Sequence, residues 1–323
     1  MFTFTSCDWF KSDDDDDMMS NCANLEGNEF LVYEYFNAGS PNITTQPIEK
    51  SNNINSGNPS ARLEGSNVVI SVPGIRVRNS STNFEVTEFL LDEDQDDCYQ
   101  RQSEFNASDS SIKTDIAAVL VLDMSTSLQG IIDDLKSYAK EFASTIVNSS
   151  SNSQVAVIFF SQRDAIEMTG FYNRTNIQTL NGLIDDFDNY QPRTALFEAT
   201  LQGIQLITSL NFEGEKSLVV FTDGGDNDSN NPSALQQQIQ NSEVLRFTIG
   251  LRGDDFDEQD LSSITSNQNN LVVANTANDL QRIFRDVTKG VISVYELLYT
   301  RSDQQLNVNE KIRIRVQVKT RPI

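Results

Sequence analysis

The chain has 323 residues, with 24 Lys and Arg against 47 Asp and Glu, which gives a formal net charge of −23. Such a surface repels nucleic acids and anionic membranes, because both are bound through basic side chains that neutralise phosphate. The sequence contains no histidine, which excludes serine–histidine catalysis, histidine-type zinc sites and histidine pH switches. No apolar run approaches the roughly 20 residues of a membrane-spanning helix.

The first 27 residues are predicted to be a disordered acidic segment. Residues 13–17 are five consecutive aspartates, which repel one another and resist burial. Residues 4–7 resemble a loose bacterial lipobox that ends in Cys7, and an acidic tract after a lipidated cysteine resembles the surface-export signal of some bacterial lipoproteins. Only six residues precede Cys7, so the charged and apolar parts of a leader are missing. Two interpretations stay open, a lipid anchor on a trimmed chain and a chance match.

The three cysteines, Cys7, Cys22 and Cys98, all lie in the first third of the chain. None belongs to a C-x-x-C pair, so neither a metal knuckle nor a thioredoxin-like site is expected. If Cys7 is acylated, Cys22 and Cys98 remain as a pair that can form a disulfide in an oxidising compartment.

Both flanks of the chain predict β-structure. In residues 28–113, runs rich in β-branched and aromatic residues alternate with polar Asn, Ser, Gly and Pro stretches. These runs are 30–36, 67–72, 74–78 and 84–91. Residues 311–319 alternate polar and apolar side chains, which indicates a half-buried strand, and 291–299 is its expected hairpin partner. We therefore expect residues 28–113 and 291–323 to build a small β-sandwich together.

The middle of the chain, residues 114–290, alternates apolar strands with amphipathic helices. The strands are predicted at 116–122, 154–160, 166–171, 217–222, 245–250 and 271–274. The helices are predicted at 127–147, 176–188, 195–210, 233–242, 257–266 and 278–289. This order predicts an α/β fold with a doubly wound, mainly parallel six-stranded sheet covered on both faces. The strand at 166–171 follows its predecessor by a turn, so we expect it at an antiparallel edge.

Oxygen-bearing side chains stand where the buried strands end. They are Asp123, Ser125 and Ser127 after the first strand, Thr194 at a helix start, and Asp223 after the strand 217–222. Open α/β sheets bind their ligands at this edge. Hydroxyl and carboxylate oxygens without imidazole or thiolate suit a hard cation, most simply Mg²⁺, with Mn²⁺ and Ca²⁺ as alternatives.

These five residues resemble the metal-ion-dependent adhesion site of the von Willebrand factor A family, in which D-x-S-x-S is followed by a loop threonine and an aspartate. The neighbouring Thr194-Ala195-Leu196 and Thr222-Asp223-Gly224 resemble the family as well. The resemblance covers about 114–290 and implies a von Willebrand-type, Rossmann-like fold. It also implies that the two serines and the threonine contact the metal, while the aspartates act mainly through water. The sequence departs from the family at Pro192-Arg193, which stiffens the loop and adds a positive charge.

The resemblance implies a surface or secreted protein that binds protein or matrix partners and is not an enzyme. Neutral hydroxyls leave the cation electrophilic, so an Asp or Glu of the partner completes its coordination shell. Arg193, Gly224 and Asp226 are expected at the rim of such a site. One alternative is a metal-dependent hydrolase or phosphoryl-transfer enzyme, against which stands the lack of a P-loop and of a second carboxylate two residues after Asp123. Another is a structural scaffold with an idle metal site.

Each site residue also has a purely structural interpretation. Ser125, Ser127 and Thr194 can cap helices, and Asp223 can open a turn. Two acidic stretches, 226–230 and 92–97, begin like calcium loops but lack the glycine and the final glutamate of such loops, so both are expected to be solvated.

Overall fold

The structure is a computed structural model, and it describes most of the chain beyond the N-terminal segment. The described residues are 22–23, 25, 29–37, 43–51, 54–55, 60–64, 67–72, 76–77, 82–92, 97–101, 112–113, 115–266, 268–292, 295–300 and 311–322. Cys7 and the acidic run 13–17 lie outside them. Of the helices that the structure describes, none has both the length and the apolar composition needed to span a bilayer.

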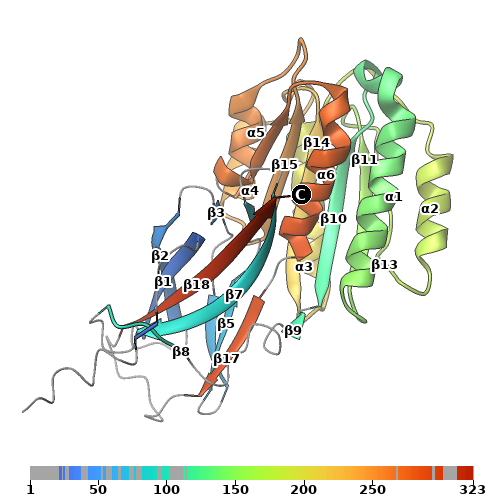
Figure 1. The fold of residues 1–323 in the computed structure, drawn as a ribbon. Helices are drawn as coiled ribbons and strands as arrows, with labels where there is room; N and C mark the ends of the chain where they lie inside the picture. Colours follow the sequence, from blue (N-terminus) through green and yellow to red (C-terminus); the bar gives the residue numbers. More distant parts are fainter. Residues whose placement is uncertain are drawn as a thin grey trace, which may run out of the picture.

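A mainly parallel sheet forms the centre of the molecule (Figure 1). Its strands are, in spatial order, β12 (Ile166–Met168), β11 (Gln154–Phe160), β10 (Ile116–Asp123), β14 (Glu215–Thr222), β15 (Leu245–Leu251) and β16 (Leu271–Ala274). A seventh short strand, β13 (Tyr172–Asn173), also pairs with β11. β12 is antiparallel to β11, which confirms the predicted edge. The order of the strands reverses between β10 and β14, where doubly wound sheets bind ligands.

Helices cover both faces of this sheet, as its apolar strands predict. They are α1 (Ile132–Ser149), α2 (Ile177–Asp186), α3 (Leu196–Ser209), α4 (Pro232–Gln240), α5 (Glu258–Ile264) and α6 (Leu280–Ile292). α1, α2 and α6 pack on the face that includes Leu120 and Leu122, and α3, α4 and α5 pack on the face that includes Val119 and Val121. All eight residues of β10 are buried, because both of its faces meet a helix layer.

The close packing of α3 on the sheet depends on Gly203. A Cβ atom at this position would lie 2.7 Å from Cδ1 of Leu218 and 3.0 Å from Cγ2 of Val121. The absent side chain therefore lets the helix backbone approach β10 and β14 closely. This approach positions α3, whose first residue, Leu196, comes two residues after Thr194.

The two flanks of the chain form one antiparallel sheet. In its described strands the order is β8-β7-β18-β1-β2-β4-β5-β17-β9. Their bounds are β1 (Glu29–Asn37), β2 (Ile43–Lys50), β4 (Ser60–Glu64), β5 (Asn67–Val72), β7 (Thr82–Asp92), β8 (Gln100–Arg101), β9 (Ile112–Lys113), β17 (Tyr295–Thr300) and β18 (Lys311–Pro322). β3 (Ile54–Asn55) and β6 (Arg76–Val77) pair separately. The structure confirms that the two flanks combine; in place of the expected β-sandwich, it shows these nine strands hydrogen-bonded in one continuous antiparallel series.

The expected hairpin between 291–299 and 311–319 is wrong. β18 pairs with β1 and β7, whereas β17 pairs with β5 and β9. Residues 291–292 belong to the end of α6. Alternation of apolar and polar residues identifies a strand but not its neighbour, and here each C-terminal strand finds its partners in the N-terminal flank.

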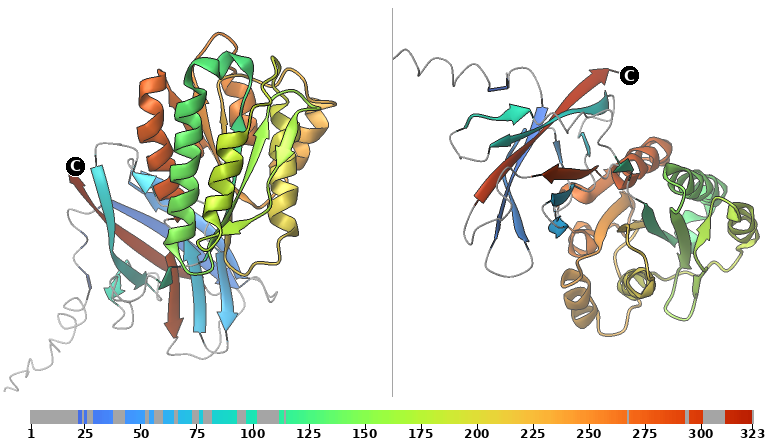
Figure 2. Two further views of the ribbon diagram at one scale, coloured as in Figure 1. Left: turned by 90° about the vertical axis from the view of Figure 1, so that its right-hand side faces the viewer. Right: turned by 90° about the horizontal axis from the view of Figure 1, so that it is seen from below.

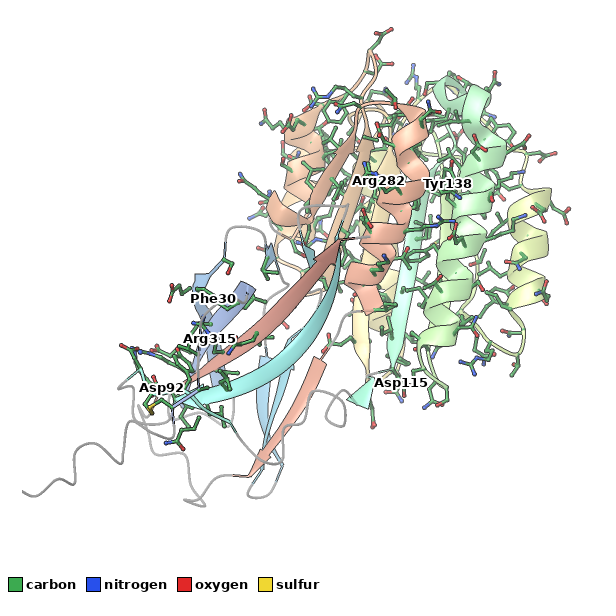
Figure 3. All side chains as sticks on the ribbon, viewed as in Figure 1. Phe30, Asp92, Asp115, Tyr138, Arg282 and Arg315 are labelled. Atoms are coloured by element: carbon green, nitrogen blue, oxygen red, sulfur yellow. A yellow bond between two sulfur atoms is a disulfide. The ribbon has the colours of Figure 1, made fainter. Side chains whose placement is uncertain are left out.

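A disulfide joins Cys22 to Cys98, which are 76 positions apart in the chain and have 5.1 Å between their Cα atoms. Beside it, the backbone N–H of Ala23 donates to the carbonyl of Tyr99 at 2.7 Å. The guanidinium of Arg315 on β18 lies 3.7 Å from the ring centre of Phe30 and 5.7 Å from that of Tyr99 (Figure 3). The disulfide and these ring contacts attach the first described residues to the flank sheet.

The flank sheet lies beside the α/β unit, toward the amino-terminal end of the central strands. Figure 2 shows the two units side by side in both views. β9, which precedes β10, lies at the bottom of the central sheet in Figure 1, and β17 follows the lower end of α6. Both connections to the flank sheet therefore leave the α/β unit at the end opposite the carboxyl edge of β10.

Candidate functional site

The loop after β10 begins with a carboxylate held at both oxygens. The backbone N–H of Ser125 donates to Oδ1 of Asp123 at 2.8 Å, and the hydroxyl of Thr222 donates to Oδ2 at 2.6 Å. The Thr222 hydroxyl also accepts from the N–H of Gly224 at 3.1 Å. Thr222 ends β14, so one buried hydroxyl ties the ends of the two central strands together. The sequence marks this threonine as a neighbour of Asp223 and gives no sign of its contact with Asp123.

The side chain of Asp123 is fully buried, as is that of Thr222. Burial raises the pKa of Asp123 to about 7, against the hydrogen bond from Thr222, and the negative charge of Asp223 raises it further. The pKa of Asp223 is itself raised, mainly by burial, while the hydrogen bond from Ser127 lowers it. In the described part of the chain, no Lys or Arg pairs with either carboxylate. Within the described residues, the negative charges of Asp123 and Asp223 are therefore not neutralised by a cationic side chain.

A chain of hydroxyl groups connects this loop to Asp223. Oγ of Ser125 lies 3.0 Å from Oγ of Ser127, and the Ser127 hydroxyl donates to Oδ1 of Asp223 at 3.1 Å. Ser125 is buried, whereas Ser127 is exposed. The structure therefore brings the D-x-S-x-S residues and the distant aspartate to one point.

Thr194 reaches the same point from the loop before α3. A Cβ atom on Gly224 would lie 3.9 Å from Oγ1 of Thr194. The side chain of Asn227 accepts from the N–H of Thr194 at 2.8 Å, and the N–H of Asn227 donates to the Thr194 carbonyl at 2.9 Å. Asn227, which sequence reasoning did not single out as a site residue, thus holds the backbone of Thr194 on both sides. The sequence around Asn227 does not indicate these hydrogen bonds, because they join two loops that are distant in the chain.

The helix-capping interpretation of these hydroxyls is not supported. Ser125 occupies the position before a short 3₁₀ turn, Thr126–Ile131, but its side chain makes no capping hydrogen bond. The residue that caps α3 is Ala195 and not Thr194. Among the described residues, none forms a hydrogen bond with the hydroxyl of Thr194. The hydroxyls of Ser125 and Ser127 are instead engaged with each other and with Asp223.

The acidic loop 226–230 is neither a calcium loop nor simply solvated. Oδ1 of Asp226 accepts from the N–H of Phe197 at 3.1 Å, at the start of α3, and from the Ser229 hydroxyl at 2.5 Å. Burial raises the pKa of Asp226. Oδ1 of Asp228 instead accepts from Arg193 at 2.9 Å. The two carboxylates thus have different partners, and Asp226 stabilises the start of α3.

The second predicted solvated loop, 92–97, is described only at its ends. Asp92 is buried and lies 3.6 Å from Arg313, so it is not solvated, while Asp97 is exposed.

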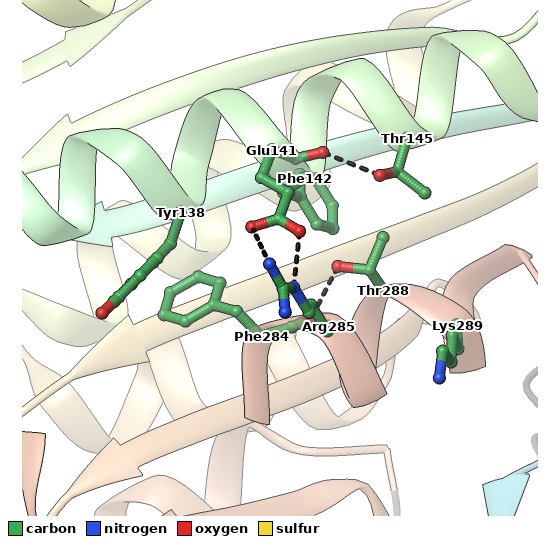
Figure 4. Close-up of a pocket in the computed structure, with 8 residues that line it drawn as sticks. All are labelled: Tyr138, Glu141, Phe142, Thr145, Phe284, Arg285, Thr288 and Lys289. Carbon is green, nitrogen blue, oxygen red and sulfur yellow. Dashed lines mark hydrogen bonds and ion pairs between the residues drawn. The ribbon is translucent and has the colours of Figure 1, made fainter. Parts of the chain in front are cut away.

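A separate hollow of about 210 Å³ lies between α1 and α6, away from this site. Figure 4 shows its lining, including Tyr138 and Phe284. Arg285 crosses it and donates through Nε to Oε1 of Glu141 at 2.6 Å. The hollow contains none of the residues at the carboxyl edge of the sheet.

The donor set at the carboxyl edge combines three hydroxyls with two carboxylates. Among the described residues, no three His, Cys, Asp or Glu side chains gather into a group that could hold a metal ion. Hard cations such as Mg²⁺ accept hydroxyl, carboxylate and water oxygens together.

The fold and this edge define an α/β domain of the von Willebrand type. The family model described as von Willebrand factor type A domain matches residues 118–286. The chain therefore belongs to the von Willebrand factor type A domain family. Among curated proteins, none matches the sequence.

Several solved structures are similar to this chain. Proximal thread matrix protein 1 from the mussel byssus is 21% identical with a TM-score of 0.48, over 58% of this chain and 50% of that one. Its form with a zinc-occupied MIDAS motif matches similarly. The pilus adhesin SpaC from Lactobacillus rhamnosus GG is 13% identical with a TM-score of 0.48, over 88% and 44% of the two chains. A von Willebrand factor type A protein from Catenulispora acidiphila is 10% identical with a TM-score of 0.46, over 84% and 67%. The chain thus spans about half the length of the mussel protein.

Proposed function

We propose that the carboxyl edge of the central sheet binds a divalent cation, most simply Mg²⁺, and that the protein uses it to bind acidic groups of a protein or matrix partner. The observation that carries this proposal is the buried carboxylate of Asp123, which is held at both oxygens by neutral donors and, among the residues that the structure describes, pairs with no Lys or Arg. A buried charge without a partner is costly, so a site of this kind is completed by a cation.

The residues present fit such a cation. Ser125, Ser127 and Thr194 offer neutral oxygens, and Asp123 and Asp223 supply the balancing negative charge. A bound cation would supply a Lewis-acidic position at which a carboxylate oxygen of the partner replaces water. Two neighbouring residues orient these groups: the Thr222 hydroxyl donates to Asp123, and the side-chain oxygen of Asn227 accepts from the backbone N–H of Thr194.

Binding is proposed without catalysis. Both oxygens of Asp123 are occupied by hydrogen bonds, so the group is poorly placed to exchange a proton with a substrate. The rim donors also belong to short loops anchored on rigid strands, which suits recognition of a fixed acidic group.

We also propose a secreted or surface location. The disulfide between Cys22 and Cys98 supports it, because such bonds persist in oxidising compartments. Lipidation of Cys7 stays a prediction.

Calorimetric titration with Mg²⁺ and Mn²⁺ tests the metal site directly. We expect saturable binding to the full chain and a loss of at least about tenfold in affinity for Asp123→Ala and Ser125→Ala. Asp186→Ala, at an exposed position on α2, is the matched control and should bind as the wild type does. Unchanged metal affinity in Asp123→Ala would refute the assignment.

A further inference from the structure

Two arginines meet one aspartate beside Thr194. Nη1 of Arg193 lies 2.9 Å from Oδ1 of Asp228, and the backbone N–H of Arg163 donates to Oδ2 of the same carboxylate at 2.9 Å. These hydrogen bonds and the charges of both arginines hold the pKa of Asp228 below its usual value. Arg163 follows the carboxyl end of β11 and Arg193 precedes Thr194, so this arginine pair lies on the rim of the proposed metal site.

One carboxylate does not neutralise two guanidinium groups. The Arg193 side chain is 65% exposed although it forms the ion pair. Arg163 is exposed, and in the described part of the chain its guanidinium forms no hydrogen bond, because its contact with Asp228 comes from the backbone. Each guanidinium carries five N–H donors, so most donors of the pair remain available to a ligand. The pair leaves a net positive charge on a protein whose total charge is −23.

The opposite side of the rim is acidic. The backbone carbonyl of Asp255 accepts from the N–H of Gly225 at 2.9 Å, which fixes the 253–257 loop against the loop after β14. Asp254, Asp255 and Asp257 are all exposed. A Cβ atom on Gly224 would lie 3.6 Å from Cβ of Asp255, so Asp255 lies beside the site. The rim is therefore positive on the side of Thr194 and negative on the side of Gly224.

We propose that this rim selects partners in which the metal-binding carboxylate is accompanied by a second acidic side chain, which the arginine pair binds. This inference rests on the proposed metal-dependent function and adds the chemical class of its partner. Guanidinium groups bind carboxylates through paired N–H donors, which gives orientation as well as attraction. The preference runs against the overall negative charge of the protein, so it is a local property of these two residues. A partner with a basic residue in place of the second acid meets the arginines with like charge and is disfavoured.

Peptide binding to the Mg²⁺-loaded full chain tests this selectivity. Three labelled peptides of equal length carry a single Asp, two Asp residues three positions apart, or one Asp and one Lys at the same spacing. Fluorescence anisotropy gives the affinity of each at fixed ionic strength and again in EDTA. We expect the two-Asp peptide to bind about fivefold more tightly than the single-Asp peptide, which is the size of one exposed ion pair, and the Asp–Lys peptide to bind most weakly.

Three variants locate the effect. Arg163→Ala keeps the backbone contact with Asp228 and should reduce the ratio of the two-Asp to the single-Asp affinity to about one. Arg193→Ala should do the same. Arg174→Ala is the control, because this exposed arginine bonds to the carbonyl of Asn148 at the end of α1 and should leave the ratio unchanged.

The outcomes separate the two proposals. Mg²⁺-dependent binding of the single-Asp peptide without any preference for the second acid overturns the inference and leaves the proposed function standing. A preference that survives in Arg163→Ala and Arg193→Ala, or one that is equally strong in EDTA, also overturns it. If none of the peptides binds in a Mg²⁺-dependent way, the inference and the proposed function fall together.

Discussion

Buried carboxylates occur both in the flank sheet and at the carboxyl edge of the central sheet, and their surroundings differ. In the flank sheet, the buried Asp92 lies 3.6 Å from Arg313, and Glu34 lies 2.9 Å from Lys311. At the central sheet, the equally buried Asp123 accepts hydrogen bonds from one N–H and one hydroxyl, and among the described residues no Lys or Arg pairs with it. In the flank sheet, these two buried carboxylates each lie beside a basic side chain of the same sheet. The central edge holds a charge that an external cation can balance.

The largest expected effect comes from removing a cation of the flank sheet. In Arg313→Ala, the fully buried Asp92 loses its cationic neighbour, and a broken buried pair costs about 3–5 kcal/mol. Urea unfolding followed by circular dichroism measures this loss. The control is the double variant Arg313→Ala with Asp92→Asn, which also removes the buried negative charge and should recover most of the stability. An equally unstable double variant would mean that the arginine acts through packing and not through charge.

The second prediction concerns the pH dependence of stability. Here, removal of the carboxylate charge is expected to stabilise the protein at high pH. Because the pKa of Asp123 is raised to about 7 from the ordinary 3.8, its proton is held in the folded state of the metal-free protein and lost in the unfolded state between these values. The contribution of this group is therefore present at low pH and disappears as the pH rises through 7. Between pH 5 and pH 7 the wild type should lose about 2 kcal/mol relative to Asp123→Asn.

Unfolding free energies in EDTA at the two pH values give this difference. Asp123→Asn should be as stable as the wild type or more stable at pH 8, unlike the flank variant Arg313→Ala. Saturating Mg²⁺ should reduce the loss in the wild type, since a cation favours the ionised carboxylate. Parallel pH profiles of the wild type and Asp123→Asn in EDTA would contradict the view that this carboxylate lacks a balancing charge.

The third prediction concerns the hydroxyl that supports Asp123. Thr222→Val keeps the branched shape but removes the donor to Oδ2 of Asp123 and the acceptor for the Gly224 N–H. A residue that orients a metal ligand typically changes affinity by 10–100-fold, so we expect Mg²⁺ binding to weaken about tenfold. Thr222→Ser restores the hydroxyl and should recover the affinity. If valine and serine behave alike, the hydroxyl does not orient the carboxylate.

The sequence predicts the central unit better than the flanks, for a physical reason. The strand 154–160 is found at its expected bounds, because a strand buried on both faces is apolar along its whole length. The helix expected from residue 127 instead begins with a 3₁₀ turn, since Ser125 and Ser127 turn toward Asp223. In the flanks, alternation identifies the strand at 311–319, but pairing across more than 200 residues leaves no local signal.

In the candidate site, too, some residues can be predicted from the sequence and others cannot. The five oxygen-bearing residues are visible in the sequence because each stands at a strand end or a helix start. Thr222 and Asn227 act on partners 99 and 33 residues away, so their contacts depend on the folded arrangement of the loops. The contact of Asp226 with the start of α3 likewise has no local signal, because it joins residues 29 positions apart.

The smallest effect is expected at the ion pair between α1 and α6. Arg285 and Glu141 are joined at 2.6 Å, yet their side chains are 54% and 40% exposed. Water and salt screen such a pair, and its ordered side chains lose conformational freedom, so Arg285→Ala should leave the unfolding midpoint unchanged within error. Thermal unfolding at low and high salt measures this directly beside Arg313→Ala. A clear destabilisation at low salt that vanishes at high salt would show that the exposed pair contributes to stability. The exposed pair and the buried pair of the flank sheet would then differ only in the size of their contributions.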